Sequence, residues 1–325
     1  APGAVIGHPD FQTGTPARRL EGGHPIPREV TVTRSVTLFG ADIHAETNGL
    51  LNRLVEAHRP LVVSHGGVST STVPSNTTLA ARAALLSGAD IIKIDVSSSV
   101  DHVFFAFHDG FENEFLGVDR NIQTMTAGEI GELSYHWKDR PLRRSRVERL
   151  TALLGEFRGR PFMFALDRSW WRWPTLLRVL DGLGMAEQVL LKVPAWETQA
   201  LEKLRQHRTK YPVLAICYTL DEVRALPIHD DEINLVGVEL IAHDDDSPWF
   251  DDSVMEQLHR DHLLTWVNSE TLTTGIPLFA GHDDEKAVAE SPSAAWSRLL
   301  DLGVDAVQTE LPWLLYHLRS RRELP

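Results

Sequence analysis

The stretch "GADIIKIDVSSSVDHVFFAFHDG", from Gly88 to Gly110, contains two apolar runs that each carry charged side chains near their ends. Lys93 and Asp95 stand two positions apart in the first run, so both point to the same side of a strand. His108 lies at the end of the second run. A lysine beside an aspartate on one face of a buried strand indicates either a functional site or a buried salt bridge.

Short apolar runs of this kind recur from Pro60 onward and alternate with helical patterns. The expected strands are 60–67, 89–96, 102–109, 161–169, 188–194, 212–219, 235–244 and 263–270. The expected helices include 45–59, 77–88, 145–159, 173–184, 197–208 and 293–303. A last run at 304–312 is either an extra piece or a replacement for one of these strands. This alternation predicts an α/β protein with a closed (β/α)8 barrel of the TIM type, and a doubly wound open sheet is the alternative.

Composition narrows the class of protein. The chain has 325 residues, of which 42% are hydrophobic and 24% charged, so a full core is expected. The formal net charge of −13 argues against a general nucleic-acid or anionic-membrane binder. No apolar run approaches the roughly 20 residues of a membrane span. The single cysteine, Cys217, lies in an apolar run and is expected to be a buried packing residue.

The first 35 residues are rich in Gly, Pro and His, and we expect an irregular N-terminal arm at 1–35 followed by a single barrel domain at 36–325. The segment 30–40 alternates and predicts a strand. Because the first residue is Ala and not Met, we expect an upstream segment to have been removed. Either a signal peptide was cleaved, or the start of the chain was chosen artificially. A cytoplasmic and a secreted location both stay open, as does the oligomeric state.

Polar residues repeatedly follow the apolar runs, at the places where the expected strands end. They are His65, Asp95, His108, Asp167, Lys192, Glu239 and Asn268. Enzymes with this barrel place their chemistry at the carboxyl ends of the strands. Seven such positions are difficult to explain by packing alone, so the sequence predicts a site at this face.

Two segments, 60–110 and 265–312, resemble the glycerophosphodiester phosphodiesterase family. That family usually reads His-Arg-Gly, Glu-Asn-Thr, Glu-Leu-Asp and His-Asp in this order, and His65, Asp95 and His108 match the first histidine, the aspartate and the second histidine. The resemblance extends over roughly 36–323, and the C-terminal part looks like a bacterial branch. It implies a phospholipase-C-like barrel that cleaves phosphodiesters in lipid metabolism. It also implies two histidines as general acid and base, and one divalent cation held by carboxylates.

Three departures from the family pattern affect the metal and the phosphate contacts. Gly66 replaces the arginine, Ser75 replaces the glutamate of Glu-Asn-Thr, and Lys93 replaces the metal-binding glutamate of the second strand. An ammonium in place of a carboxylate removes a ligand and repels the cation. We therefore expect no metal cofactor, with a weak divalent cation at Asp95 and Asp167 as the alternative. Lys93 would then supply the charge, as an arginine does in the similar bacterial phosphatidylinositol-specific phospholipases C.

The candidate residues fall into two groups. The expected catalytic residues are His65, His108, Asp95 and Lys93. The expected substrate-binding residues are Lys192, Arg168, Asp167, Glu239, Trp266, Asn268 and Trp196. The expected ligand is a small phosphodiester or a sugar-containing molecule. The motif "AGHDDE" at 280–285 predicts a helix cap rather than a metal site.

Two other functions compete with a phosphodiesterase that needs little or no metal. One is a glycoside-cleaving enzyme that uses two of Asp95, Asp167 and Glu239, because glycoside hydrolysis needs a pair of carboxyl groups. The other is a non-catalytic protein that binds a ligand or a partner. A Lys93–Asp95 pair held in contact would weaken the glycosidase hypothesis, and an occluded strand-end face would favour the non-catalytic one.

Overall fold

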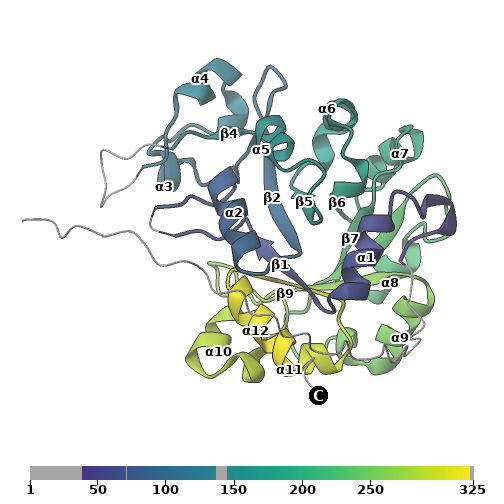
Figure 1. Cartoon of the computed structure of the whole chain (residues 1–325). Coiled ribbons are helices and arrows are strands. Elements are labelled where there is room, and N and C mark those ends of the chain that lie inside the picture. The colour runs from purple at the N-terminus through teal and green to yellow at the C-terminus, as the bar shows by residue number, and fades with distance from the viewer. Residues whose placement is uncertain (1–38, 71, 137–144, 323–325) are drawn as a thin grey trace, which may run out of the picture. The chain divides into compact units, whose positions relative to one another are not determined.

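Residues 39–70, 72–136 and 145–322 are described by the computed structural model, and they contain a closed barrel of parallel strands (Figure 1). The barrel strands are β1 (Leu61–His65), β2 (Ile91–Ser98), β5 (Met163–Asp167), β6 (Val189–Pro194), β7 (Val213–Cys217), β8 (Leu235–Leu240), β9 (Leu264–Asn268) and β10 (Ala306–Thr309). Strand β1 pairs in parallel with both β10 and β2, which closes the sheet. The predicted (β/α)8 barrel is confirmed, and the open sheet is wrong.

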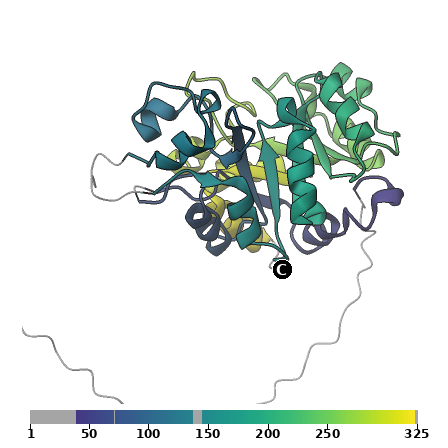
Figure 2. The same cartoon turned by 90° about the horizontal axis from the view of Figure 1, so that it is seen from above.

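Helices connect successive strands and lie around the barrel (Figures 1 and 2). They are α1 (Gly49–Ala57), α2 (Thr78–Leu86), α5 (Leu150–Glu156), α6 (Thr175–Leu183), α7 (Thr198–Gln206), α8 (Leu220–Ala225), α9 (Asp252–Arg260), α10 (Asp284–Ala289), α11 (Pro292–Asp301) and α12 (Pro312–Arg322). Short 3-10 helices lie at Asp42–His44, Ile122–Thr124, Trp170–Arg172, Ala186–Gln188 and Pro248–Phe250. Each predicted helix has its counterpart, although the one expected from 145 begins only at Leu150, because Glu148 and Arg149 form the short strand β4.

Successive side chains of each strand point alternately into the barrel and out toward the helices, so the core has an inner and an outer part. The inner residues, such as Leu61, Ile91 and Leu264, pack inside the barrel together with Leu51 and Leu54 of α1. Helix α1 therefore closes the amino-terminal end of the barrel. The alternate strand residues pack outward against the other helices. Inward positions at the opposite, carboxyl ends of the strands are left for polar side chains.

A bulge in β8 determines which of its residues point inward. Val213 pairs with Leu235, whereas the next residue, Leu214, pairs with Gly237, so Val236 is an extra residue in β8. This insertion changes the phase of the strand and places Glu239 on the inner face. A Cβ atom at Gly237 would lie 2.4 Å from the carbonyl oxygen of Leu264, so only glycine fits there.

The segment between β2 and α5 is an excursion from the barrel. It contains β3 (Phe104–Ala106), α3 (Glu112–Leu116), α4 (Ala127–Glu132) and β4 (Glu148–Arg149), which group at one edge in both views (Figures 1 and 2). Strand β3 pairs antiparallel with the end of β2. Its Phe104 and Ala106 pack into the main core, whereas Phe105, with Phe107 just after the strand, belongs to a separate cluster. The expectation that 102–109 is a barrel strand is therefore wrong, and the last run, at 304–312, takes its place as β10.

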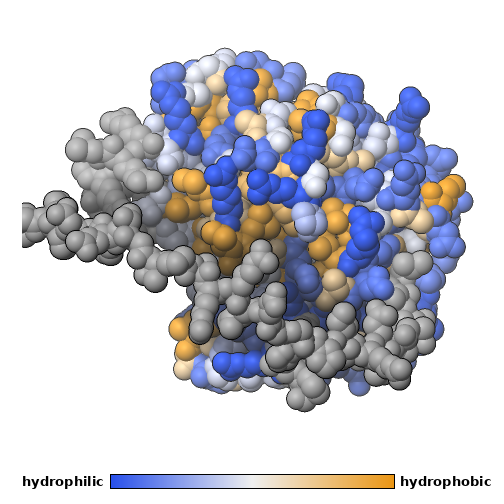
Figure 3. Space-filling model, in the orientation of Figure 1, coloured by the Kyte–Doolittle hydropathy of each residue, from blue (hydrophilic) through white to orange (hydrophobic). Residues whose placement is uncertain are grey.

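The remaining expectations concern the N-terminal segment, the single cysteine and membrane spans. The predicted arm at 1–35 lies outside the described residues, as does all of the predicted strand 30–40 except Phe39 and Gly40, and the domain boundary stays a prediction. Cys217 is buried, and burial raises the pKa of its thiol. Among the helices that the structure describes, none is long and apolar enough to span a bilayer. On the face seen in Figure 3, hydrophobic and hydrophilic residues both occur, in irregular patches.

Candidate active site

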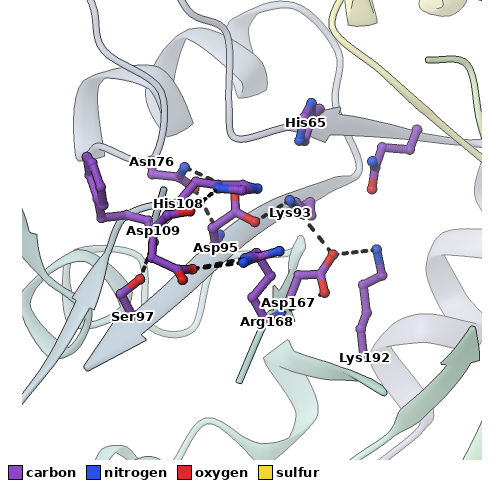
Figure 4. Close-up of polar contacts among 12 residues, drawn as sticks. His65, Asn76, Lys93, Asp95, Ser97, His108, Asp109, Asp167, Arg168 and Lys192 are labelled. Atoms are coloured by element: carbon purple, nitrogen blue, oxygen red, sulfur yellow. Dashed lines mark hydrogen bonds and ion pairs between the residues drawn. The ribbon is translucent and has the colours of Figure 1, made fainter. Parts of the chain in front are cut away.

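Four barrel strands contribute a row of alternating charges at their carboxyl ends. Figure 4 shows Asp95, Lys93, Asp167 and Lys192 of this row. The Nζ atom of Lys93 lies 2.5 Å from Oδ1 of Asp95 and 3.7 Å from Oδ2 of Asp167. Lys192 Nζ lies 2.9 Å from the same Asp167 oxygen and 2.8 Å from Oε2 of Glu239. Two ammonium groups thus alternate with three carboxylates. Asp95 and Asp167 are direct register partners on β2 and β5, so the lysines offset the repulsion that these neighbours would otherwise have.

Neutral side chains complete the row at each end. Asn268 donates from Nδ2 to Oε1 of Glu239 at 2.5 Å and accepts from Nε1 of Trp266 at 3.3 Å. At the other end, Asn76 donates from Nδ2 to Oδ2 of Asp95 at 3.1 Å, and its Oδ1 accepts from the Asp95 backbone N–H at 2.9 Å. The charged row is therefore held in a hydrogen-bonded frame and has little freedom to rearrange.

Burial makes these charge pairs interdependent. The side chains of Lys93 and Asp95 are only 5% and 2% exposed. Burial alone would raise the pKa of Asp95, but Lys93, with help from His108 and His65, brings that pKa below its ordinary value. Burial likewise opposes ionisation of Asp167, and Lys192 and Lys93 outweigh it and lower its pKa. The pKa of Lys192 is raised because Asp167 and Glu239 overcome the cost of its own burial.

His65 is the last residue of β1 and the register partner of Lys93. Its Nδ1 lies 3.2 Å from Oε2 of Glu270 and 3.5 Å from Oε1 of Glu310. Gln308 holds Glu270 by donating from Nε2 to Oε1 at 2.9 Å. The side chain of His65 is 26% exposed, so solvent and small molecules can reach it.

His108 follows β3 and lies on the excursion rather than on a barrel strand. Its Nδ1 bonds to the backbone carbonyl of Asp109 at 2.8 Å. The Asp109 carboxylate in turn accepts from Nε and Nη2 of Arg168, at 3.1 and 3.0 Å, and from Gln123 at 2.8 Å. Arg168 follows β5 and has a φ of +55°, a strained value for a side-chain-bearing residue. It ties the excursion with His108 to the barrel.

The loop after β1 brings Asn76 into contact with Asp95. Gly67 has a φ of +77°, and a Cβ atom there would lie 2.6 Å from the backbone of Ala80 in α2. Only glycine allows this close approach of loop and helix. Thr77 then caps α2 by accepting from the Ala80 backbone N–H at 3.2 Å. The Gly-Gly turn and the cap together fix Asn76 against Asp95.

The carboxylates at the site do not fit the divalent cation that the sequence resemblance implies, because ammonium groups already engage them. Such a cation requires several oxygen ligands with free lone pairs. Here the ammonium of Lys93 lies against Asp95 and within 4 Å of Asp167, and Lys192 contacts Asp167 and Glu239. Over the part of the chain that the structure describes, there is no group of three or more His, Cys, Asp or Glu residues placed to bind a metal.

The predicted aromatic residues differ in their exposure. Trp266 is fully buried inside the barrel, where its ring lies 5.6 Å from Lys192 Nζ, so it supports the charged row from below. Trp196 is 52% exposed after β6, and its ring lies 5.6 Å from that of Tyr218. Tyr218 also lies 5.8 Å from the ring of His243, which makes an exposed aromatic group on three successive strand-end loops.

Several site residues were absent from the sequence prediction. Glu270 and Glu310 face Nδ1 of His65. Gln308 holds Glu270, and Asn76 holds Asp95. Asp284 was expected only as part of a cap. Asp283 is indeed the cap of α10, whereas Asp284 accepts from Ser269, Thr309 and the backbone N–H of Glu310. The polar inward position Gln308 on β10 followed the same alternation as the predicted residues and could have been found from it.

A closed parallel barrel with ionisable side chains at its strand ends defines the class of α/β-barrel enzymes. The model of the Glycerophosphoryl diester phosphodiesterase family matches residues 65–312, which is most of the chain, and the chain therefore belongs to that family. It is accordingly a hydrolase of the phosphodiesterase type. No curated protein matches the sequence.

Solved structures support the same fold. A glycerophosphodiester phosphodiesterase from Agrobacterium tumefaciens is 21% identical with a TM-score of 0.57, over 80% of this chain and 99% of that one. A glycerophosphoryl diester phosphodiesterase from Parabacteroides distasonis is 15% identical with a TM-score of 0.60, over 89% and 95%. An Oleispira antarctica phosphodiesterase in complex with the product sn-glycerol-3-phosphate is 15% identical with a TM-score of 0.59, over 82% and 99%.

Proposed function

We propose that the protein hydrolyses a small glycerophosphodiester, with His65 and His108 as the acid–base pair and Lys93 in place of a metal ligand. Family membership supports the reaction type. The observation that carries the finer proposal is the position of Lys93 Nζ, 2.5 Å from Asp95 and 3.7 Å from Asp167. The ammonium thereby stands where a carboxylate of the family pattern would face the cation.

Electrostatic repulsion disfavours a metal ion beside the ammonium of Lys93. Two unit charges about 4 Å apart interact by about 4 kcal/mol at an effective dielectric near 20. Changing a carboxylate to an ammonium alters the local charge by two units, so a divalent cation loses an attraction and gains a repulsion. A fixed ammonium can instead face a phosphoryl oxygen and stabilise the charge that develops in the transition state.

The reaction then needs only proton transfers by the two imidazoles. One imidazole accepts a proton from water as its oxygen forms a bond to phosphorus. The bond from phosphorus to the leaving oxygen breaks, and the other imidazole donates a proton to that oxygen. One water is consumed, and a phosphomonoester and an alcohol are released. Imidazole suits both roles near neutral pH.

The glycosidase alternative has less support from the contacts. Asp95 and Asp167 are paired with Lys93, and Asp167 and Glu239 with Lys192. Each candidate carboxylate is thus engaged by an ammonium, whereas glycoside hydrolysis requires two carboxyl groups that face the substrate. A non-catalytic role would fit an occluded site, but the imidazole of His65 is partly exposed at the strand ends.

The test is hydrolysis of glycerophosphodiesters with and without excess chelator. We expect activity to persist in chelator and to fall by about a hundredfold to ten-thousandfold in each of His65→Ala and His108→Ala. His102→Ala, an exposed histidine on the β2–β3 turn, is the matched control and should retain activity. Activity that appears only with added Ca²⁺ or Mg²⁺ would refute the role of Lys93, and full activity in both histidine variants would refute the acid–base pair.

A further inference from the structure

The two histidines have different partners at Nδ1. In His65 this atom faces two carboxylates, Glu270 at 3.2 Å and Glu310 at 3.5 Å. In His108 it bonds to a neutral backbone carbonyl at 2.8 Å. A carbonyl oxygen only accepts, so Nδ1 of His108 carries the hydrogen, and Nε2 of the neutral ring has a free lone pair. The carboxylates behind His65 instead favour the doubly protonated ring. Asp95 acts on both imidazoles, but its charge is already paired with Lys93.

Of the two carboxylates behind His65, Glu270 is the better placed. Its side chain is 14% exposed, whereas that of Glu310 is 69% exposed. Glu270 is also fixed by the Nε2 donor of Gln308. An exposed carboxylate is screened by water and salt, whereas a largely buried and oriented one acts at closer to its full strength.

We propose that Glu270 is the positioning residue that holds His65 in its protonated form, which makes His65 the general acid and His108 the general base. This assignment rests on the proposed phosphodiesterase function and gives each imidazole one role. Water loses its proton to Nε2 of His108 while its oxygen bonds to phosphorus. The leaving oxygen separates from phosphorus and takes the Nε2 proton of His65.

The charges around His65 are consistent with this assignment. The groups that face it are Glu270 and Glu310 after β9 and β10, and Lys93 and Asp95 on β2. Burial and Lys93 lower the pKa of His65, and Glu270, Glu310 and Asp95 raise it, with a net rise above the ordinary value. A general acid with a raised pKa stays protonated over more of the neutral range.

The test compares Glu270→Gln with Glu310→Gln by two independent measurements. The first is the pKa of the His65 imidazole, followed by NMR titration of labelled histidine and assigned with His65→Gln. We expect Glu270→Gln to lower this pKa and Glu310→Gln to lower it less. The second is the pH profile of kcat/KM. Its alkaline limb should move to lower pH in Glu270→Gln, with a several-fold loss at alkaline pH. Glu270→Asp should restore part of both effects.

The outcomes separate this inference from the proposed function. An unchanged His65 pKa in Glu270→Gln would overturn the inference even in an active enzyme. A shift of the acidic limb instead of the alkaline one would also overturn it, because His65 would then be the base. Absence of phosphodiesterase activity in the unaltered protein would remove the proposed function. The titration would still show whether Glu270 sets the protonation of His65.

Discussion

The ammonium of Lys93 lies 2.5 Å from the carboxylate of Asp95, two positions along the same buried strand. The pair extends through Asp167, Lys192 and Glu239 into a row that crosses half of the barrel. Buried charges of this kind depend on one another, because removal of one leaves another without compensation in a poorly solvated place. The row is therefore both a candidate site and a structural element.

Removal of the Lys93 charge should destabilise the fold. We expect Lys93→Met to lower the free energy of unfolding by about 3–5 kcal/mol, because it leaves Asp95 and Asp167 buried beside each other. The double variant Lys93→Met, Asp95→Asn should recover part of this loss. Arg82→Met is the control, because Arg82 pairs with Glu156 on the surface, and its loss should cost at most about 1 kcal/mol. Urea unfolding measures all three, and equal costs for Lys93→Met and Arg82→Met would contradict the argument.

Restoration of carboxylates should create a cation site. Lys93→Glu combined with Ser75→Glu returns the two positions to the family pattern beside Asp95. We expect this variant to bind Ca²⁺ or Mg²⁺ in calorimetric titration and its activity to become sensitive to chelator, because oxygen ligands replace the repelling ammonium. Ser75→Glu alone keeps Lys93 and should bind no better than the unaltered protein. Equal binding by both variants would show that Lys93 does not decide metal use.

The sequence predicted the barrel because its short apolar runs recur regularly and are separated by helical patterns. It also predicted that Lys93 and Asp95 share a face, since a spacing of two fixes this in any strand. The misassigned run at 102–109 shows the limit of such patterns. An apolar strand in a hairpin on β2 has the same composition as a barrel strand, and only the pairing partner distinguishes them.

The contacts between distant segments had no signal in the sequence. Lys192 and Glu239 meet because β6 and β8 flank β7 in the barrel, and a bulge of one residue in β8 turns Glu239 inward. Glu270 lies beyond the end of β9, and its importance comes from the position of His65 on β1. Tertiary geometry of this kind depends on strand order and register, which a single sequence does not specify.

Loss of the ion pair between Arg168 and Asp109 should lower catalytic activity more than stability. Arg168→Ala frees the loop that carries His108, so we expect kcat to fall by about ten- to a hundredfold, because small misplacements of a catalytic group are costly. Arg168→Lys should restore little, since a lysine cannot donate from two nitrogens as the guanidinium does. Steady-state kinetics of both, with the neighbouring Arg172→Ala as control, provide the measurement. A change confined to KM would indicate that Arg168 binds substrate instead of positioning His108.

Asp284 should make stability depend on pH in a direction opposite to that of Asp95. Burial raises the pKa of Asp284 to about 7, although hydrogen bonds from Thr309, the Glu310 backbone and Ser269 oppose this. An unfolded Asp titrates near 3.9, so the folded state holds the extra proton between these values. The contribution of Asp284 to stability is then complete below about pH 4 and is lost as the pH rises through about 7.

We therefore compare the free energy of unfolding of the unaltered protein with that of Asp284→Asn. We expect the difference, unaltered minus variant, to fall from about pH 4.5 to about pH 8. Urea unfolding at these two pH values measures it. Asp283→Asn is the control, because asparagine caps a helix as well as aspartate does and its effect should vary little over this range. A difference that grows with pH would show that the hydrogen bonds keep Asp284 ionised.

The exposed aromatic group should contribute to substrate binding with little effect on folding. Trp196 is 52% exposed and its ring lies 5.6 Å from that of Tyr218, on the loops that follow β6 and β7. We expect Trp196→Ala to raise KM several-fold with kcat nearly unchanged, because a contact made equally in the ground and transition states affects binding alone. Leu86→Ala, at an exposed position at the end of α2, is the control and should leave both constants unchanged. If Trp196→Ala lowers kcat and leaves KM unaltered, the aromatic group acts on the reacting atoms or on loop closure, and its role as a binding surface is wrong.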